Sequence, residues 1–212
     1  MAGCSPRTAG LDRHPRRGAA HLESRRTYPV YMSEACISPV ANRLGAAALT
    51  LSDAIREATE AATGMAGGIP AALVSLQEWA DGRSVDVLAE AMRVSHSRAV
   101  RVVDRLQAAG LARRESDPSD GRRALVWLEP AGRELAERAL DARSRVLLGA
   151  VANLDAADVR DLDRLLAALL DVTTVDTRAA RGTCRLCDAH ACGHYDGACP
   201  VTRAADRRRT PA

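Results

Sequence analysis

The chain has 212 residues, a mass of 22.5 kDa and 47% hydrophobic residues, which suffices for one or two domains with a buried core. Aromatic residues make up only 2% of the sequence, which argues against a large β-sandwich or barrel. The net charge is +3, and all thirty basic residues are Arg. No apolar run approaches the eighteen residues of a membrane span. We expect a soluble, cytoplasmic protein without a secretory signal.

Three segments follow one another along the chain. Residues 1–39 are rich in Arg, Gly, Ala and Pro without periodicity, so we expect a disordered basic leader, within which Met32 is an alternative translation start. Residues 40–174 carry the helical patterns. Residues 175–212 form a Cys-rich tail that ends in a basic run.

The first four predicted elements are helices. Apolar spacing predicts them over residues 40–62, 71–80, 85–92 and 96–109. Pro70 suits the first turn of the second helix, and Gly110 ends the fourth. Ser84 and Ser95 are the expected N-caps of the third and fourth helices.

A β-hairpin is predicted next. The runs 111–115 and 122–128 flank a polar tip with Asp117-Pro118 and Asp120-Gly121, which are turn sequences. Helices follow over 130–151 and 156–172, with Asp155 as the N-cap of the second, and residues 172–181 have the weak pattern of a linker. The expected fold class is mainly α with one small β element.

Basic charge is concentrated in the middle of the chain. Residues 93–123 carry eight Arg against four acidic residues, whereas residues 40–92 carry three against seven and residues 124–176 carry six against ten. A local basic region of this kind is what contact with nucleic acid requires. A solvated charged helix face is the alternative explanation.

The helices 85–92 and 96–109 have the spacing of a helix-turn-helix. On the second of them, Ala99, Val103 and Leu106 share one face, and three arginines share roughly the opposite face: Arg98, Arg101 and Arg105. Arg can pair with guanine in the major groove, and the helix N-terminus at Ser95, His96 and Ser97 favours phosphate or base edges.

The segment from Arg93 to Leu128 resembles the winged helix-turn-helix of the MarR family of bacterial transcription regulators. The family's wing signature, D-x-R-x-x-x-V-x-L-T, matches the sequence from Asp120 to Leu128, with Glu129 in place of the final Thr. Val103-Asp-Arg-Leu106, Gly110-Leu111 and Gly132 also match the family pattern, and the resemblance covers about residues 40–174.

The resemblance implies a homodimer formed by the first and last helices, with one recognition helix per subunit in successive major grooves. It also implies that Arg122 reaches a minor groove from the wing, with Asp120 orienting it. The predicted DNA-binding residues are Ser95, His96, Ser97, Arg98, Arg101, Arg105, Asp120, Arg122 and Arg123.

The predicted function is therefore that of a DNA-binding transcription regulator, a repressor in preference to an activator, and not an enzyme. Its partners would be double-stranded DNA and a second copy of the chain. Family members often respond to small aromatic effectors, for which this chain offers few aromatic residues beyond Trp79 and Trp127. Packing within the hairpin is the preferred role for Trp127.

The tail contains four cysteines within sixteen residues: Cys184, Cys187, Cys192 and Cys199. Zinc prefers four thiolate or imidazole ligands, so we predict a zinc site at these cysteines, for which His190 or His194 could replace one ligand. A thiol redox switch is the main alternative, and an iron–sulfur centre or an inert tail remain others. Cys4 and Cys36 are isolated and are expected to be unremarkable thiols.

A competing function comes from another class of protein. The helical body could serve protein–protein contacts in a metal- or redox-active module that does not bind DNA. The salt dependence of duplex binding separates the two hypotheses. Affinity for the duplex should fall steeply with salt concentration only if the protein contacts phosphates.

Overall fold

A computed structural model describes residues 34–209, with side chains omitted at residues 34–37 and at 122. The chain divides into two compact units, residues 1–50 and 51–212. In the first unit the described residues form one stretch of helix, part of α1 (Glu34–Thr63), with Val40, Leu44 and Leu49 exposed. The predicted leader lies largely outside the described residues, and its boundary at residue 39 is wrong because α1 begins at Glu34.

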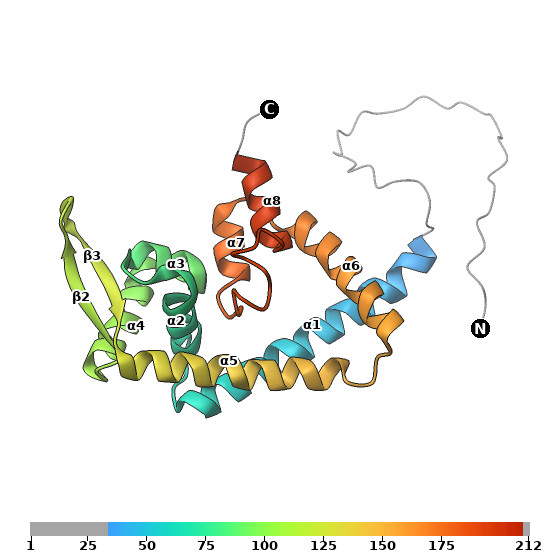
Figure 1. Cartoon of the computed structure of the whole chain (residues 1–212), viewed down its shortest axis with the longest axis horizontal. Helices are drawn as coiled ribbons and strands as arrows, with labels where there is room; N and C mark the ends of the chain where they lie inside the picture. Colours follow the sequence, from blue (N-terminus) through green and yellow to red (C-terminus); the bar gives the residue numbers. More distant parts are fainter. Residues whose placement is uncertain (1–33, 210–212) are drawn as a thin grey trace, which may run out of the picture. The chain divides into compact units, whose positions relative to one another are not determined.

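The second unit contains the elements that the sequence predicts, in the predicted order (Figure 1). The fold class, mainly α with a small antiparallel sheet, is confirmed. None of the helices within residues 34–209 is long and apolar enough to cross a membrane. The remaining elements are α2 (Ile69–Ser75), η1 (Leu76–Ala80), β1 (Arg83–Ser84), α3 (Val85–Met92), α4 (His96–Ala108), β2 (Ala112–Asp117), β3 (Asp120–Leu128), α5 (Pro130–Val151), α6 (Ala156–Thr173), α7 (Thr177–Thr183) and α8 (Pro200–Arg209).

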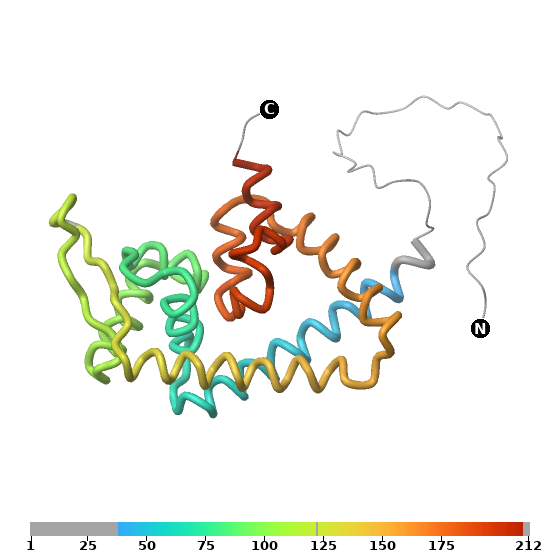
Figure 2. Tube along the Cα trace, in the orientation of Figure 1, coloured from blue at the N-terminus to red at the C-terminus, as the bar shows by residue number. Residues whose placement is uncertain are grey.

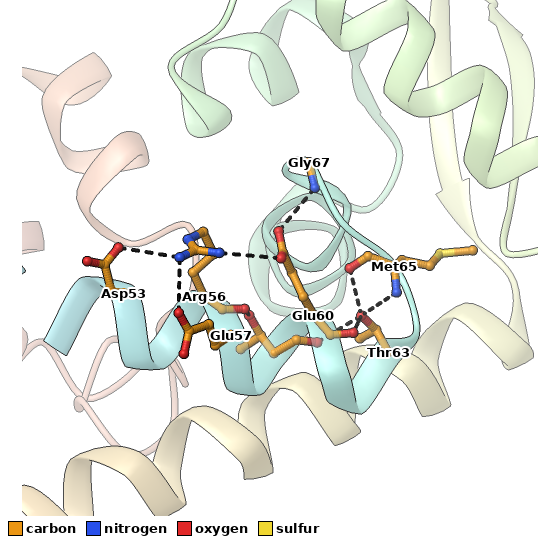
Figure 3. Close-up of polar contacts among 8 residues, drawn as sticks. Asp53, Arg56, Glu57, Glu60, Thr63, Met65 and Gly67 are labelled. Carbon is orange, nitrogen blue, oxygen red and sulfur yellow. Dashed lines mark hydrogen bonds and ion pairs between the residues drawn. The ribbon is translucent and has the colours of Figure 1, made fainter. Parts of the chain in front are cut away.

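Side chains at the end of α1 fix the loop that leads into α2. Figure 3 shows Glu60 accepting a hydrogen bond from the Gly67 backbone N–H (3.2 Å) while its other oxygen lies 3.7 Å from Arg56. Thr63 Oγ1 donates to the carbonyl of Thr59 (2.8 Å) and accepts from the Met65 N–H (3.3 Å). These bonds satisfy polar groups that a helix end otherwise leaves unpaired.

The sheet has three strands in the order β1-β3-β2, all antiparallel. In the hairpin, Ala112 pairs with Leu128 and Ser116 with Ala124, and the register slips beside Asp117. The two-residue strand β1, in which Arg83 pairs with Val126, was not predicted because two residues carry no alternating pattern. Gly82 precedes it with a positive φ, and an added Cβ there would lie 2.6 Å from the Trp127 ring.

The core of the second unit is formed by apolar side chains from α2, η1, α3, α4 and the base of the hairpin. Leu73, Leu88, Val103, Leu106 and Val126 are entirely buried in it. Val103 and Leu106 are on the predicted inner face of the fourth helix, so this part of the helical pattern is confirmed. The arrangement fixes α4 against α2 and α3 and leaves its other face open to solvent.

Asp81 joins three elements at the base of the hairpin. Its Oδ1 accepts the backbone N–H of Leu128 at the end of β3 (2.7 Å), and its Oδ2 pairs with Arg133 in the first turns of α5 (2.6 Å). Nearby, the Leu111 carbonyl accepts the Glu129 N–H (2.9 Å). A single carboxylate therefore connects η1, the wing and the long helix.

Several local predictions need correction. Ser84 occupies the N-cap position of α3 but its side chain makes no capping bond, whereas Ser95 does cap α4, through the Arg98 N–H (3.3 Å). The second predicted helix ends as a π-helical turn, η1. The predicted linker 172–181 is wrong, because it contains the end of α6 and the start of α7, which Asp176 caps through the Ala179 N–H (2.6 Å).

Gly132 is predicted to be essential for the packing of α5. It is buried where α5 passes the hairpin base, and an added Cβ would overlap the Leu111 carbonyl and lie 2.8 Å from Leu128 Cδ1. Gly132→Ala should therefore lower the free energy of unfolding by about 1–3 kcal/mol, measured by urea denaturation. Gly149→Ala, in the same helix with open space around it, is the matched control and should be neutral or stabilising, and equal effects of the two changes would contradict the packing argument.

Candidate nucleic-acid interface

The turn between α3 and α4 has a conformation that few residues adopt. Arg93 has a φ of 55°, and it is the one non-glycine residue with a positive φ among those the structure describes. The Val94 N–H bonds back to the Ala89 carbonyl (3.0 Å), and Ser95 then starts α4. This short turn sets the angle between the two helices of the helix-turn-helix.

The outer face of α4 presents three arginines. Arg98, Arg101 and Arg105 are all exposed, and within residues 34–209 their side chains form no hydrogen bond or ion pair. Their guanidinium groups are therefore available to an external anion. The sequence predicted both this placement and its separation from the buried Ala99, Val103 and Leu106.

At the N-terminus of α4, two predicted contact residues already have partners. His96 Nδ1 lies 2.6 Å from Asp86 Oδ1 on α3, and both side chains are exposed. Ser97 Oγ lies 3.1 Å from Ser95 Oγ. The His96 contact fixes its ring toward α3 and leaves Nε2 as the ring atom for a further bond.

The wing is attached to α4 by Arg114. This β2 residue pairs with Asp104 on α4 (2.6 Å) and donates to the Val100 carbonyl (3.1 Å). Its neighbour Arg113 lies over the Trp127 ring, 5.6 Å from the centroid, so packing within the hairpin is the role of Trp127 that the structure supports. Sequence analysis did not single out Arg114, since its partner lies ten residues away on another element.

At the tip of the wing, Asp120 pairs with Arg123 (3.3 Å). The Arg122 side chain, which the resemblance assigns to a minor groove, lies outside the described side chains. Ser119 donates to Asp117 from both its N–H (2.8 Å) and its Oγ (2.7 Å), and these bonds lower the pKa of the Asp117 carboxyl. The tip is therefore an ordered turn.

The four tail cysteines gather in the loop between α7 and α8. The Cys187 N–H bonds to the Cys184 carbonyl (3.0 Å), which places the two cysteines on one turn, and the Cys192 thiol donates to the Ala189 carbonyl (3.5 Å). Interaction between the two thiols of this turn raises the pKa of Cys184 and lowers the pKa of Cys187 to about 6, and burial raises the pKa of Cys192 to about 11. Cys199 is buried and the other three are half-buried.

A cavity of about 230 Å³ adjoins the cysteines. Its walls include Trp79, Cys184, Cys187, Cys192 and His194. Within residues 34–209, no group of three or more Cys, His, Asp or Glu side chains is placed to hold a metal ion as it stands. The zinc site therefore stays a prediction.

Comparison with known proteins agrees with this geometry. Residues 73–123 match the family model of the MarR family, which spans the helix-turn-helix and most of the wing. The chain is therefore similar to the MarR family over residues 73–123. A solved family protein from Rhodococcus sp. RHA1 is described as a transcriptional regulator. No curated protein matches the sequence significantly.

Several solved structures, MarR family proteins among them, share the fold. A family protein from Bacillus stearothermophilus is 23% identical with a TM-score of 0.58, covering 65% of this chain and 95% of that one. Sco3205 of Streptomyces coelicolor, in complex with DNA, is 23% identical with a TM-score of 0.54, covering 69% and 92%. CouR of Rhodococcus jostii RHA1, bound to p-coumaroyl-CoA, is 25% identical with a TM-score of 0.51, covering 65% and 95%.

Sequence analysis missed the residues that attach the tail to the helix-turn-helix. Glu78 accepts the Ala189 N–H through Oε2 (2.7 Å), and its carbonyl accepts the Tyr195 hydroxyl (2.7 Å). Arg181 on α7 forms an ion pair with Glu90 on α3. No local pattern marks these residues, since the partners are 91 to 117 positions apart.

Cys187 is predicted to be the most reactive of the tail thiols. With a pKa of about 6 it is mostly thiolate at pH 7, whereas Cys192, at about 11, is almost wholly protonated. Brief iodoacetamide treatment of the reduced protein at pH 7, followed by peptide mass spectrometry, should modify Cys187 first. Its rate should fall about tenfold at pH 5, as a thiolate becomes a minor species, and equal labelling of Cys187 and Cys192 would contradict the assignment.

Proposed function

We propose that this chain is a homodimeric transcriptional repressor that acts in the cytoplasm by binding an inverted repeat in DNA. The observation that carries the proposal is the row of Arg98, Arg101 and Arg105 on the open face of a helix whose other face is buried. Arg forms bidentate contacts with guanine, and an arginine row on the second helix of this motif suits the major groove. Sco3205, which has the same fold, was solved in complex with DNA, and this supports the proposal.

The wing adds contacts beside the recognition helix. Arg114 links β2 to α4, so the wing and the recognition helix would approach DNA as one body. Asp120, Arg122 and Arg123 lie at or beside the tip, where Arg122 is proposed to enter a minor groove. Ser95, His96 and Ser97 are proposed to contact phosphate at the helix N-terminus.

Exposed apolar side chains support association with a second copy. No residue of α6 is buried, and Leu165, Leu166 and Leu169 are 49%, 44% and 42% exposed. Leu148 on α5 and Val159 on α6 are exposed as well. An apolar row of this extent on a water-soluble chain indicates an interface, and two-fold pairing is the common form. A dimer bound across an operator would repress by occupying it.

The proposal includes the Cys-rich tail as a sensing appendage, through zinc binding or thiol oxidation. Cys184, Cys187 and Cys192 line one cavity, and this supports a joint role. A small-molecule effector remains part of the proposal. CouR was solved with p-coumaroyl-CoA, and in this chain Trp79 lines the cavity of about 230 Å³.

The dimeric protein is predicted to select an inverted repeat. Two-fold symmetry places the half-sites about one helical turn apart, roughly 10–10.5 bp from centre to centre. Selection from a random duplex library, followed by sedimentation of the complex, should return symmetric sites bound by two chains. Asymmetric sites bound by one chain would overturn the proposal.

The same selected duplex tests the competing protein-interaction hypothesis. The logarithm of the binding constant should fall steeply with the logarithm of salt concentration, with a slope of about −0.9 per phosphate contact. A slope near zero would instead favour the module that does not bind DNA.

Replacement of single arginines should separate base contacts from phosphate contacts. Arg101→Ala should cost about 1–3 kcal/mol of binding free energy and relax preference at one position of each half-site; we expect Arg98→Ala to act similarly. Arg122→Ala should weaken binding to all sequences and reduce the salt slope by about one. Fluorescence anisotropy on matched and mismatched duplexes measures both.

Arg164→Ala is the control for the loss of one positive charge, which all of these Arg→Ala variants share. Arg164 is exposed on α6 and pairs with Asp161 (3.4 Å), so its removal should leave DNA affinity unchanged. Wild-type affinity in both Arg101→Ala and Arg122→Ala would show that the groove assignment is wrong.

A further inference from the structure

The Cys-rich tail is held against the helix-turn-helix by specific polar contacts. Ser75 Oγ donates to the Arg185 carbonyl (3.3 Å). Glu78 receives hydrogen bonds from Ala189 and Tyr195. Figure 2 follows the chain from α6 through α7 and the compact loop to α8, and α7 packs against α3. The tail is therefore attached to the domain that positions α4.

Two contacts hold α7 beside the turn that precedes α4. Gly182 is buried at the end of α7, where an added Cβ would overlap the Arg93 Nε, so the absence of a side chain lets Arg93 lie across the helix. Next to this contact, Arg181 of α7 forms an ion pair with Glu90 on α3. These contacts bring the tail to the helix that carries the arginine row.

A cleft of about 610 Å³ lies between the start of α7 and the turn before α4. Arg93 and Ser95 line it from the turn, and Asp176 and Arg178 line it from α7. Ser95 caps α4 by accepting the Arg98 N–H (3.3 Å). The cleft therefore adjoins the first turn of the helix that is proposed to enter the major groove.

The cleft carries positive charge that the chain itself leaves unpaired. Arg93 and Arg178 are exposed, and neither side chain forms a hydrogen bond or an ion pair within the part of the chain that the structure describes. The two carboxylates of the cleft already have partners, since Glu90 pairs with Arg181 and Asp176 caps α7. Two guanidinium groups are thus available to an anion, and guanidinium binds phosphate with particular strength.

Arg178 also occupies a position where a cation does not stabilise the helix. It is the second residue of α7, and the first turn of a helix carries a partial positive charge that favours acidic side chains over Arg. Neither its helix nor a partner within the described chain accounts for a positive charge there. A phosphate from outside the chain would account for it.

We propose that α7 extends the DNA-binding surface, with Arg178 and Arg93 contacting a backbone phosphate beside the groove that α4 enters. This inference rests on the proposed DNA-binding function and adds to it a contact from the tail, outside residues 73–123 that match the family model. The N-terminus of a recognition helix lies near the DNA backbone, and the cleft shares Ser95 with that end of α4. Contacts with phosphate fix position and orientation without reading bases.

Substitution of Arg178 tests the contact by fluorescence anisotropy on the selected duplex. Arg178→Ala should weaken binding about threefold for each subunit, the size of an exposed ion pair, and should reduce the salt slope by about one per subunit. The loss should be the same on matched and mismatched duplexes. Arg178→Lys keeps the charge and should retain the slope and most of the affinity. Wild-type affinity and slope in Arg178→Ala would overturn the inference.

A control and a stability measurement separate contact with DNA from a structural role. Arg160 is exposed on α6 and is likewise unpaired among the described residues, so Arg160→Ala should keep the affinity and the slope. Arg178→Ala should leave the melting temperature unchanged or raise it, because it removes a cation from the first turn of a helix. A lower melting temperature in Arg178→Ala, or an equal loss of affinity in Arg160→Ala, would contradict a phosphate contact at Arg178.

Neutral methylphosphonates in place of single phosphates locate the contact on the duplex. At one position in each half-site, this replacement should weaken binding by the wild-type protein and leave binding by Arg178→Ala unchanged, as in a double-mutant cycle. If no phosphate shows this dependence on Arg178, the inference is wrong. An acidic protein segment would then be the better occupant of the cleft.

The same experiments distinguish failure of this inference from failure of the proposed function. If the wild-type protein binds the selected duplex and Arg101→Ala weakens that binding while Arg178→Ala does not, the contact from α7 is wrong and the proposed function stands. If the wild-type protein selects no duplex at all, the proposed function fails and the inference fails with it. Weaker binding and a reduced salt slope in Arg178→Ala, with wild-type behaviour in Arg160→Ala, would support both.

Discussion

The position of the wing relative to the helix-turn-helix depends on the carboxylate of Asp81. This side chain accepts the Leu128 N–H and pairs with Arg133, so the end of η1, the end of β3 and the start of α5 share one anchor. Below it, the Leu111 carbonyl contacts α5 at Gly132, where a larger residue would not fit. The wing can stand at a fixed angle to α4 because its base is held in this way, while Arg114 fixes its middle.

Sequence alone predicted the parts of the fold that depend on local pattern. The inner face of α4 followed from the spacing of Val103 and Leu106, and the hairpin from its turn residues, because each signal lies within a few positions. The same reasoning placed Arg98, Arg101 and Arg105 on the open face. It failed at α7 and α8, which are short and have little apolar periodicity, so that only Asp176 and Pro200 marked their starts.

The interactions that sequence could not predict are those between distant segments. His96 was expected to be free for DNA, yet its ring is paired with Asp86. Glu78 has no local sequence signal, yet it accepts two hydrogen bonds from residues more than a hundred positions away. Such pairs depend on how the tail folds back, and they decide whether the cysteines belong to an independent appendage or to the domain that contains the helix-turn-helix. The structure supports the second description.

The exposed apolar row on α6 bears on the stability of the protein at low cellular concentration. No residue of this helix is buried and several of its leucines are exposed, so in the proposed dimer the helix would gain stability from the partner and folding would be linked to pairing by mass action. The melting temperature should then rise with protein concentration, and newly made chains would stay vulnerable to proteases until they meet. The proposed regulator would therefore need a minimum cellular concentration, below which too few dimers form to occupy its DNA sites even if the dimer binds them tightly.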